Sequence, residues 1–450
     1  MKRAVALIDG EHYPPVVRFA LGELAHECEV VAAVFLGGTE KVDLDRGSTT
    51  YGVPLITGAT PEDAVRAALE QYAPDEVVDL SDEPVVSSAD RLRLASLALS
   101  LGVDYRGADF VFTAPVDRVR TSTPALGIIG TGKRVGKTAV SAFVARQLKA
   151  AGLDIVVLAM GRGGPAQPEL IHGDQVELTT PDLLELARQG EHASSDNYED
   201  AVMSRVTTVG CRRCGGGMAG ETFFSNVPEG AILADSLGKE LLVLEGSGSA
   251  IPPVFADASV LVIGAGRGAG YVSDYFGPYR ISRADLAVIS SAEEPVASAH
   301  DVERIREEIA RIAPELPVVA TTLRPVPLQP IAGRRVLFAT TAPAAIAGKL
   351  GEYLAEEYGA HVVAVSTNLS DRSRLREDLL RYAGEFDTLV TELKAAAIDV
   401  VAEAGEEAGV PTVLCDNVPV AVDGQDLGEL VDAAARLAIK RGRMRIGGEL

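Results

Sequence analysis

The sequence predicts an α/β protein in which a central domain with a mostly parallel sheet is flanked by smaller α/β domains at both ends. Its 450 residues exceed what one typical hydrophobic core serves. Short apolar segments alternate with amphipathic ones along the whole chain, which is typical of parallel strands joined by helices. Segment 116–123, between two prolines, and the proline-rich segment 324–335 indicate linkers. We therefore expect domains at 1–120, 121–330 and 331–450.

The elements follow from the same alternation. In the first domain the pattern predicts strands at 3–9, 29–38, 75–81 and 109–115, and helices at 14–27, 61–73 and 88–102. In the central domain it predicts strands at 125–131, 154–160, 241–247, 259–265, 286–292 and 317–323. In the last domain it predicts strands at 334–342, 361–367, 386–393 and 411–418, with helices between them. Residues 162–240 form a long polar insertion, and irregular stretches of that length are usually functional or mobile.

Composition and charge limit the function. The chain is 47% hydrophobic and 24% charged, as in globular proteins, and has no apolar run long enough for a transmembrane helix. The apolar run of the N-terminal segment is interrupted by Asp9 and Glu11, which predicts a first strand rather than a signal peptide. We therefore expect a cytoplasmic protein. A net charge of -22 argues against binding nucleic acid or an anionic membrane. If the protein handles phosphate, it must concentrate positive charge locally.

The segment GTGKRVGKT, residues 130–138, lies between an apolar segment and a helical one. Glycines allow backbone N–H groups to approach a phosphate closely, and the following helix N-terminus adds partial positive charge. Lys137 would reach the β- and γ-phosphates and Thr138 would bind Mg²⁺. The loop is one residue longer than the strict phosphate-loop (P-loop) pattern and is similar to that of dethiobiotin synthetases. We expect nucleotide binding by Gly130, Thr131, Gly132, Lys133, Arg134, Val135, Gly136, Lys137, Thr138 and Ala139.

An acidic residue and an arginine follow two other central strands. Glu245 ends the strand in LLVLEGSGS and is a candidate to hold Mg²⁺ beside the γ-phosphate, with a solvent-facing carboxylate as the alternative. Arg162 and Gly163 follow the strand in LAMGRGG, and we expect Arg162 to clamp a phosphate because ligands bind at this edge of α/β sheets.

The segment GCRRCGGG is a candidate anion nest. Arginine forks match phosphate oxygens, and a glycine run adds backbone donors. We expect substrate phosphates to contact Arg162, Gly163, Arg212, Arg213, Gly215, Gly216, Gly217 and Arg267. Catalytic roles are predicted for Lys137, Arg162, Arg213 and Glu245. A structural loop, or metal binding by Cys211 and Cys214, are the alternatives for this segment, and a plain flexible turn is the alternative for Arg267.

Three other groups received simpler interpretations. Asp196, Glu199 and Asp200 are more typical of a solvated helix start than of metal ligands or general bases. Asp9, Glu11 and His12 follow the first strand, where a doubly wound fold places ligand loops. Cys28 and Cys415 lie in apolar contexts that predict core positions.

Five segments in order carry a resemblance over nearly the whole chain: LIDGEHYPPV, GTGKRVGKTAVSAF, MGRGGP, GCRRCGGGMAGE and LEGSGSAIPPV. With them the sequence resembles the cyclic 2,3-diphosphoglycerate synthetases. The resemblance implies an enzyme that uses ATP to close 2,3-bisphosphoglycerate into an intramolecular pyrophosphate, releasing ADP and phosphate. Activity on 2-phosphoglycerate is also linked to the family. Mg²⁺ is the expected metal, with K⁺ as a further candidate, and enzymes of this class usually form a homodimer.

Two other kinds of protein remain open at this stage. One is another ligase of the dethiobiotin synthetase type, which would activate a carboxylate or carbamate. The other is a P-loop ATPase that acts as a nucleotide-dependent switch or a metallochaperone, and metal binding at Cys211 and Cys214 would favour it.

Overall fold

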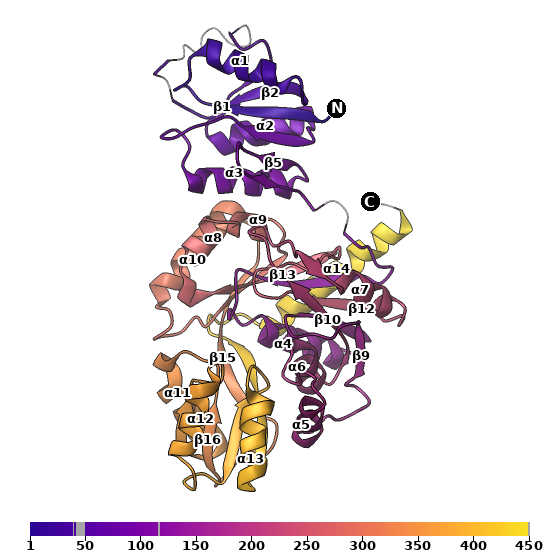
Figure 1. The fold of residues 1–450 in the computed structure, drawn as a ribbon, viewed down its shortest axis with the longest axis vertical. Coiled ribbons are helices and arrows are strands. Elements are labelled where there is room, and N and C mark those ends of the chain that lie inside the picture. The colour runs from indigo at the N-terminus through magenta and orange to yellow at the C-terminus, as the bar shows by residue number, and fades with distance from the viewer. Residues whose placement is uncertain (39, 42–49, 116–117, 449–450) are drawn as a thin grey trace. The chain divides into compact units, whose positions relative to one another are not determined.

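A computed structural model describes residues 1–38, 40–41, 50–115 and 118–448 (Figure 1). It confirms the predicted α/β class with a mostly parallel sheet. The chain forms two compact units, Met1–Arg118 with Gly270–Arg283, and Val119–Ala269 with Ala284–Leu450. Residues 116 and 117 of the first predicted linker lie outside the described residues. Within the described part of the chain, no helix is long and apolar enough to cross a membrane.

The N-terminal unit contains a sheet of order β3-β2-β1-β4-β5-β6, parallel except for β6. Its elements are β1 (Arg3–Ile8), α1 (Pro14–Leu24), β2 (Glu29–Phe35), β3 (Leu55–Ile56), α2 (Pro61–Tyr72), β4 (Glu76–Asp79), α3 (Ser88–Ser100), β5 (Asp104–Arg106) and β6 (Val111–Phe112). The short helices α8 (Gly270–Ser273) and α9 (Gly277–Ile281) also belong to this unit. Helix α9 packs on α3, and the rings of Phe276 and Phe112 lie 4.9 Å apart. A segment predicted for the central domain therefore packs in the N-terminal unit.

The second unit is built on one sheet of order β11-β10-β8-β12-β7-β13-β14-β15-β19-β18-β16-β17, with β9 paired to β10. The elements of its first half are β7 (Ala125–Gly130), α4 (Lys137–Ala150), β8 (Ile155–Gly161), β9 (Glu169–His172), α5 (Thr180–Arg188), α6 (Asp196–Ser204), β10 (Thr207–Cys214), β11 (Phe224–Ser225), α7 (Val227–Asp235), β12 (Leu241–Glu245) and β13 (Ala258–Gly264). The elements of its second half are η2 (Ala265–Arg267), β14 (Leu286–Ser290), α10 (Ala299–Ile312), β15 (Val318–Pro327), β16 (Arg335–Ala339), η3 (Ala344–Ile346), α11 (Ala347–Tyr358), β17 (His361–Ser366), α12 (Arg372–Arg381), β18 (Thr388–Glu392), η4 (Ala397–Ala402), α13 (Glu403–Ala408), β19 (Thr412–Ala421) and α14 (Leu427–Gly447).

The polar insertion at 162–240 is more regular than the sequence predicts. It contains β9, α5, α6, β10, β11 and α7, and β10 joins the main sheet as a parallel neighbour of β8. Strand β10 is not an apolar run, because its buried part ends at Cys211 and two arginines follow. The expectation of a long irregular stretch was therefore wrong.

The sheet continues through the second predicted linker. Residues 324–327 belong to β15 and pair antiparallel with residues 415–418 of β19. Strand β15 thus pairs with β14 through its first half and with β19 through its second half. The predicted domain division at 120 and 330 stays a prediction, but the start of this linker is a strand.

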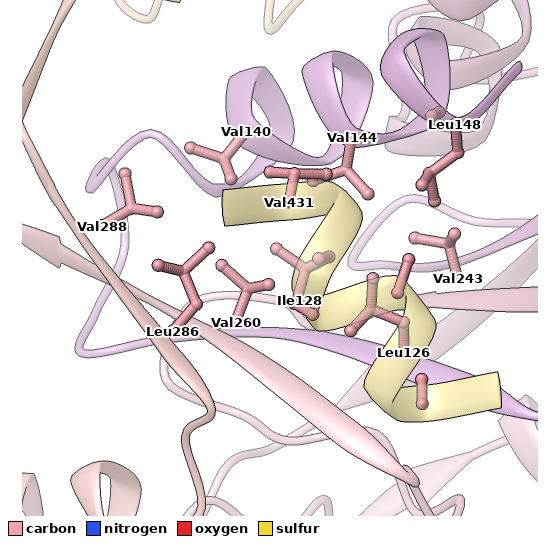
Figure 2. Close-up of a cluster of buried hydrophobic side chains, with 14 of the residues drawn as sticks. Leu126, Ile128, Val140, Val144, Leu148, Val243, Val260, Leu286, Val288 and Val431 are labelled. Atoms are coloured by element: carbon pink, nitrogen blue, oxygen red, sulfur yellow. The ribbon is translucent and has the colours of Figure 1, made fainter. Parts of the chain in front are cut away.

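The last helix returns to the core around the P-loop strand. Helix α14 packs against α4, β7 and β13, and Val431 lies among Leu126, Val144 and Val260 (Figure 2). These side chains are fully buried or nearly so, and burying a valine side chain stabilises a fold by about 1.5 kcal/mol or more. The core beneath the P-loop therefore includes residues from near the end of the chain.

Candidate functional site

The P-loop has the geometry that its sequence predicts. Strand β7 is buried along its length, and α4 begins at Lys137 directly after Gly136. Gly136 has φ 86°, a left-handed conformation that glycine adopts without strain. A Cβ on Gly130 would lie 2.7 Å from Lys137 Cδ, so the lysine packs where any larger residue would stand. Glycine is therefore required at both positions for the lysine to fold over the loop.

Lys137 lies inside the loop rather than in solvent. Its Nζ donates a hydrogen bond to the Gly132 carbonyl oxygen at 2.7 Å, and its side chain is buried. Burial lowers the pKa of Lys137 to about 8, although Glu245 and Asp196 oppose the shift. A buried ammonium held by one neutral carbonyl is poised to bind a stronger acceptor such as a phosphate oxygen.

Four carboxyl groups gather beside this lysine. Asp196, Glu199 and Asp200 come from α6, and Glu245 ends β12. All eight residues from Asn197 to Ser204 are buried, since α6 packs against α4, β8, β9 and β10. The expectation of a solvated helix start was therefore wrong, because the acidic face of the helix points toward the P-loop edge of the sheet.

Burial raises the pKa of every member of this carboxyl cluster. The pKa of Glu199 rises to about 8 and that of Glu245 to about 7, with burial as the largest cause in both. Burial, and then the charge of Glu245, raises the pKa of Asp200 well above its ordinary value. Within the described residues, both oxygens of Asp200 and Oε2 of Glu245 lack a hydrogen-bond partner. The raised pKa values therefore favour the neutral forms of these carboxyl groups, and the oxygens just named have no described partner near the loop.

Lys394 reaches this cluster from the C-terminal part of the chain. It follows β18, and its Nζ lies 3.0 Å from Glu199 Oε1. Burial would lower the pKa of Lys394, but the carboxylates of Glu199, Glu392 and Asp416 outweigh burial and raise it. No sequence motif marks Lys394, so sequence reasoning missed it.

Arg162 and Arg213 converge at the same edge. A Cβ on Gly248, after β12, would lie 2.9 Å from Arg162 Nη2 and 3.2 Å from Arg213 Nη2. Arg213 Nη2 donates to the Ser247 carbonyl oxygen at 2.8 Å. Among the described residues, Arg162 and the Lys133 ammonium have no side-chain hydrogen bond or ion pair. Uncompensated cations next to a P-loop form an anion site.

Arg212 is separated from Arg213 by the alternation of side chains along β10. Its Nε donates to the carbonyl oxygens of Pro165 at 2.6 Å and Gly164 at 3.1 Å, so it fixes the backbone after β8. The anion nest predicted for both arginines stays a prediction, and in this structure Arg212 contacts backbone carbonyl oxygens instead.

The glycine run and Arg267 lie outside the cavity lining. Gly215, Gly216 and Gly217 are not among the described residues that line the cavity. Arg267 Nη2 donates to the Lys133 carbonyl oxygen at 3.2 Å, so Arg267 contacts the P-loop backbone. Substrate contacts by these residues and by Arg212 stay predictions.

The cysteine alternative has little geometric support. Cys211 is buried in an apolar core and Cys214 is exposed, because residues three apart on a strand face opposite sides. Burial raises the pKa of the Cys211 thiol to about 12, which disfavours the thiolate that metals bind. Throughout the described ranges, no group of three or more His, Cys, Asp or Glu residues is arranged to hold a metal ion. Cys28 and Cys415 are buried, as predicted.

The residues after β1 form a closed network in the N-terminal unit. Asp9 is fully buried, and its Oδ1 accepts hydrogen bonds from the backbone N–H groups of Glu11 and His12. Its Oδ2 accepts from the N–H of Asp82 after β4. Asp9 therefore holds two loops at the carboxyl edge of this sheet.

A cavity of about 720 Å³ lies between the P-loop edge and the strands of the C-terminal part. Lys133, Lys137 and Thr138 line one side of it, with Arg162 and Asp196 from the neighbouring loops. The opposite wall comes from elements after β14. That wall includes Val296, Leu323, Arg324, Ile346, Lys349 and Tyr353.

A P-loop on a parallel sheet, with buried carboxyl groups and unpaired cations around it, defines the class of P-loop proteins that bind phosphorylated ligands. Three family models match in order: the cyclic 2,3-diphosphoglycerate synthetase N-terminal domain at residues 3–113, its P-loop domain at 125–322 and its C-terminal domain at 327–418. This chain belongs to the cyclic 2,3-diphosphoglycerate synthetase family, as the resemblance predicted.

Relatives named cyclic 2,3-diphosphoglycerate synthetase agree over nearly their whole length. The protein of Rubrobacter xylanophilus is 49% identical over 447 residues, which are 99% of each chain. That of Methanothermus fervidus is 45% identical over 442 residues, 96% of each chain. A solved structure of LpxK from Aquifex aeolicus in complex with ATP matches 71% of this chain and 91% of its own, with a TM-score of 0.41 and 14% identity.

Proposed function

We propose that this protein uses ATP to convert 2,3-bisphosphoglycerate into cyclic 2,3-diphosphoglycerate, with release of ADP and phosphate. The observation that carries the proposal is the set of unpaired cations, Arg162 and Lys133, beside the buried P-loop lysine. Bringing ATP and a bisphosphorylated acid together concentrates negative charge, and these cations offset it. The family to which the chain belongs supports the choice of substrate.

The chemistry requires no general base. One substrate phosphate oxygen, already anionic, attacks the γ-phosphorus of ATP; a P–O–P bond forms, and the bond to the β-phosphate oxygen breaks to release ADP. The second substrate phosphate then attacks the substrate-derived phosphorus of the new pyrophosphoryl group. That step closes the ring and expels the transferred phosphoryl group as inorganic phosphate. Lys137, Arg162 and Arg213 would hold the converging oxygens in line.

Thr138 and Glu245 are suited to hold Mg²⁺. Glu245 ends the strand next to the P-loop strand and has a buried Oε2 without a hydrogen-bond partner among the described residues. Burial raises its pKa, while the Thr138 hydroxyl beside it acts in the opposite direction. Mg²⁺ is commonly bound by one or two carboxylates together with substrate phosphates. When bound, it would neutralise charge between the β- and γ-phosphates.

The test is phosphorus NMR of the purified protein with ATP, Mg²⁺ and 2,3-bisphosphoglycerate, beside a Lys137→Ala control. We expect pyrophosphate-region signals that belong to no nucleotide, with ADP and phosphate in equal amounts, and none of these with the control. A parallel sample with 2-phosphoglycerate tests the second substrate linked to the family. A homodimer is part of the proposal and is tested by analytical ultracentrifugation.

Two outcomes would refute the cyclase proposal. ATP that stays intact in the presence of 2,3-bisphosphoglycerate would exclude it. ATP hydrolysis at one rate with and without the substrate would instead favour a nucleotide-dependent switch.

A further inference from the structure

The cavity has a charged side and an apolar side, separated by the P-loop. Strands β12, β8 and β10 lie on one side of β7, and the loops after β12 and β8, with the end of β10, carry Gly248, Arg162 and Arg213. Strands β13, β14 and β15 lie on the other side of β7. There Val296 after β14 and Leu323 within β15 provide apolar lining, beside the polar Ser291, Glu293, Glu294, Thr322 and Arg324. The sheet order therefore places cationic and apolar surfaces on opposite sides of the loop.

The apolar side is closed by the C-terminal part of the chain. Ile346 ends η3, and Leu350 and Tyr353 lie on α11; all three line the cavity. One contact joins this wall to the loop after β14, and a second joins it to β15. Lys349 Nζ donates to the Glu294 carbonyl oxygen at 2.6 Å, and the Arg324 guanidinium lies 5.6 Å from the centre of the Tyr353 ring.

Arg324 completes this link, since its Nη1 lies 2.9 Å from Glu293 Oε2. We call the space bounded by Val296, Leu323, Ile346, Leu350 and Tyr353 the apolar cleft. Its walls come from three separate segments that are bridged by these contacts.

The apolar cleft begins at the P-loop itself. A Cβ on Gly136, the last residue before α4, would lie 3.6 Å from Leu323 Cδ1. A ligand whose phosphates lie on the N-terminus of α4 can therefore extend directly into the cleft.

The cations on this side of the cavity already have partners. Arg324 pairs with Glu293, and Lys349 donates to a carbonyl oxygen rather than to a carboxylate. Arg162 after β8 and Lys133 in the P-loop are unpaired among the described residues. Phosphate groups are thus favoured beside Arg162, whose charge has no partner among the described residues, over the cleft, where the cations named here already donate hydrogen bonds.

The chemistry of 2,3-bisphosphoglycerate and of the nucleotide indicates which of them the apolar cleft binds. 2,3-Bisphosphoglycerate is small and anionic throughout, so it gains nothing from an apolar wall. A nucleoside presents a flat base that buries apolar area and stacks on aromatic and guanidinium groups. We propose that the apolar cleft binds the nucleoside of the nucleotide, so that the C-terminal part of the chain recognises the base. This inference rests on the proposed use of ATP and places the acceptor phosphate on the Arg162 side.

The test compares a ligand that has a nucleoside with one that lacks it. ADP and inorganic pyrophosphate are titrated into the full-length protein with Mg²⁺ by isothermal calorimetry, so no turnover is needed. We expect Tyr353→Ala and Ile346→Ala each to weaken ADP binding by about tenfold, the loss of one good aromatic or aliphatic contact. Pyrophosphate binding is expected to stay within about twofold of wild type, because its contacts remain.

Tyr382→Ala is the matched control. Tyr382 is partly buried in another core cluster of the C-terminal part and is outside the cavity lining. ADP affinity should be unchanged in this variant, and Ile346→Ala decides the matter if Tyr353→Ala does not fold.

The inference is overturned if the variants lower the affinities for ADP and pyrophosphate by the same factor. It is also overturned if ADP affinity is unchanged in both cleft variants. These binding results are independent of product formation. If the wild-type protein makes no cyclic product but the cleft variants bind ADP more weakly and pyrophosphate equally well, the proposed reaction is refuted. The assignment of the apolar cleft to the nucleoside would still stand.

Discussion

The ion pair between Lys394 and Glu199 gives the sharpest prediction. It joins the C-terminal part of the chain to the carboxyl cluster beside the P-loop, with Nζ and Oε1 3.0 Å apart. The Lys394 side chain is 27% exposed and that of Glu199 is 8% exposed. The perturbation is a double-mutant cycle of Lys394→Met and Glu199→Gln.

The magnitude follows from the distance and the burial. Two unit charges at this separation attract by about 5.5 kcal/mol at an effective dielectric constant of 20. Partial exposure of Lys394 screens part of this, and Glu199 can take up a proton when its partner is lost because burial raises its pKa to about 8. We expect each single substitution to lower the free energy of unfolding by about 2.5 kcal/mol, and the double by about 2 kcal/mol, a coupling of about 3 kcal/mol.

The assay is urea unfolding followed by far-UV circular dichroism, since the chain has no tryptophan. The control is a second cycle on the Arg188–Glu406 pair, which joins α5 to α13 at the surface and should show no measurable coupling. A coupling energy for Lys394 and Glu199 below about 0.5 kcal/mol would refute the view that this pair stabilises the contact between the C-terminal part of the chain and the carboxyl cluster.

Four further predictions concern single residues. Arg162→Ala should lower kcat/KM for 2,3-bisphosphoglycerate by about 100-fold, a loss of about 2.7 kcal/mol of transition-state binding, whereas Arg212→Ala should mainly lower the thermal midpoint. Asp200→Asn should change the free energy of unfolding by less than about 1 kcal/mol in urea titrations at pH 7, because burial raises the pKa of Asp200 and favours its neutral form, which the amide resembles. Burial alone would raise the pKa of Asp235, but hydrogen bonds from the segment before β7 lower it. Wild type should therefore exceed Asp235→Ala in stability above about pH 4 and lose that advantage as the pH falls through the folded pKa, which urea titrations at pH 7 and pH 3 would show. Val431→Ala should destabilise the second unit by about 2 kcal/mol in thermal unfolding, because it leaves a cavity in a fully buried contact.

The parts of the fold that could be predicted are those with a local signal. Strands such as β7 and β13 are continuous apolar runs, so their positions follow from the sequence alone. The sequence pattern does not indicate strand β10, because two arginines follow its buried part. Their side chains donate hydrogen bonds to carbonyl oxygens of the loops beside the sheet. The packing of α14 on β7 joins segments about 300 residues apart, and no periodicity indicates which partner a helix selects.

The candidate site divides in the same way. Lys137 and Thr138 were predicted because their chemistry is carried by one contiguous motif. Asp196, Glu199 and Asp200 were interpreted as solvated because composition does not show which face of a helix is buried. Their spacing of i, i+3 and i+4 puts three acids on one helix face without a lysine or arginine nearby in the helix, and that was the available signal.

The net charge of -22 raises the question of how so acidic a chain can attract phosphate. Burial raises the pKa values of Asp196, Glu199, Asp200 and Glu245, which favours their neutral forms where a phosphate must approach. Lys394 compensates Glu199 when that carboxyl is ionised. Among the described residues, Arg162 and Lys133 form no ion pair with this cluster. The raised pKa values of these buried acids thus reduce the negative charge that a phosphate meets beside the P-loop.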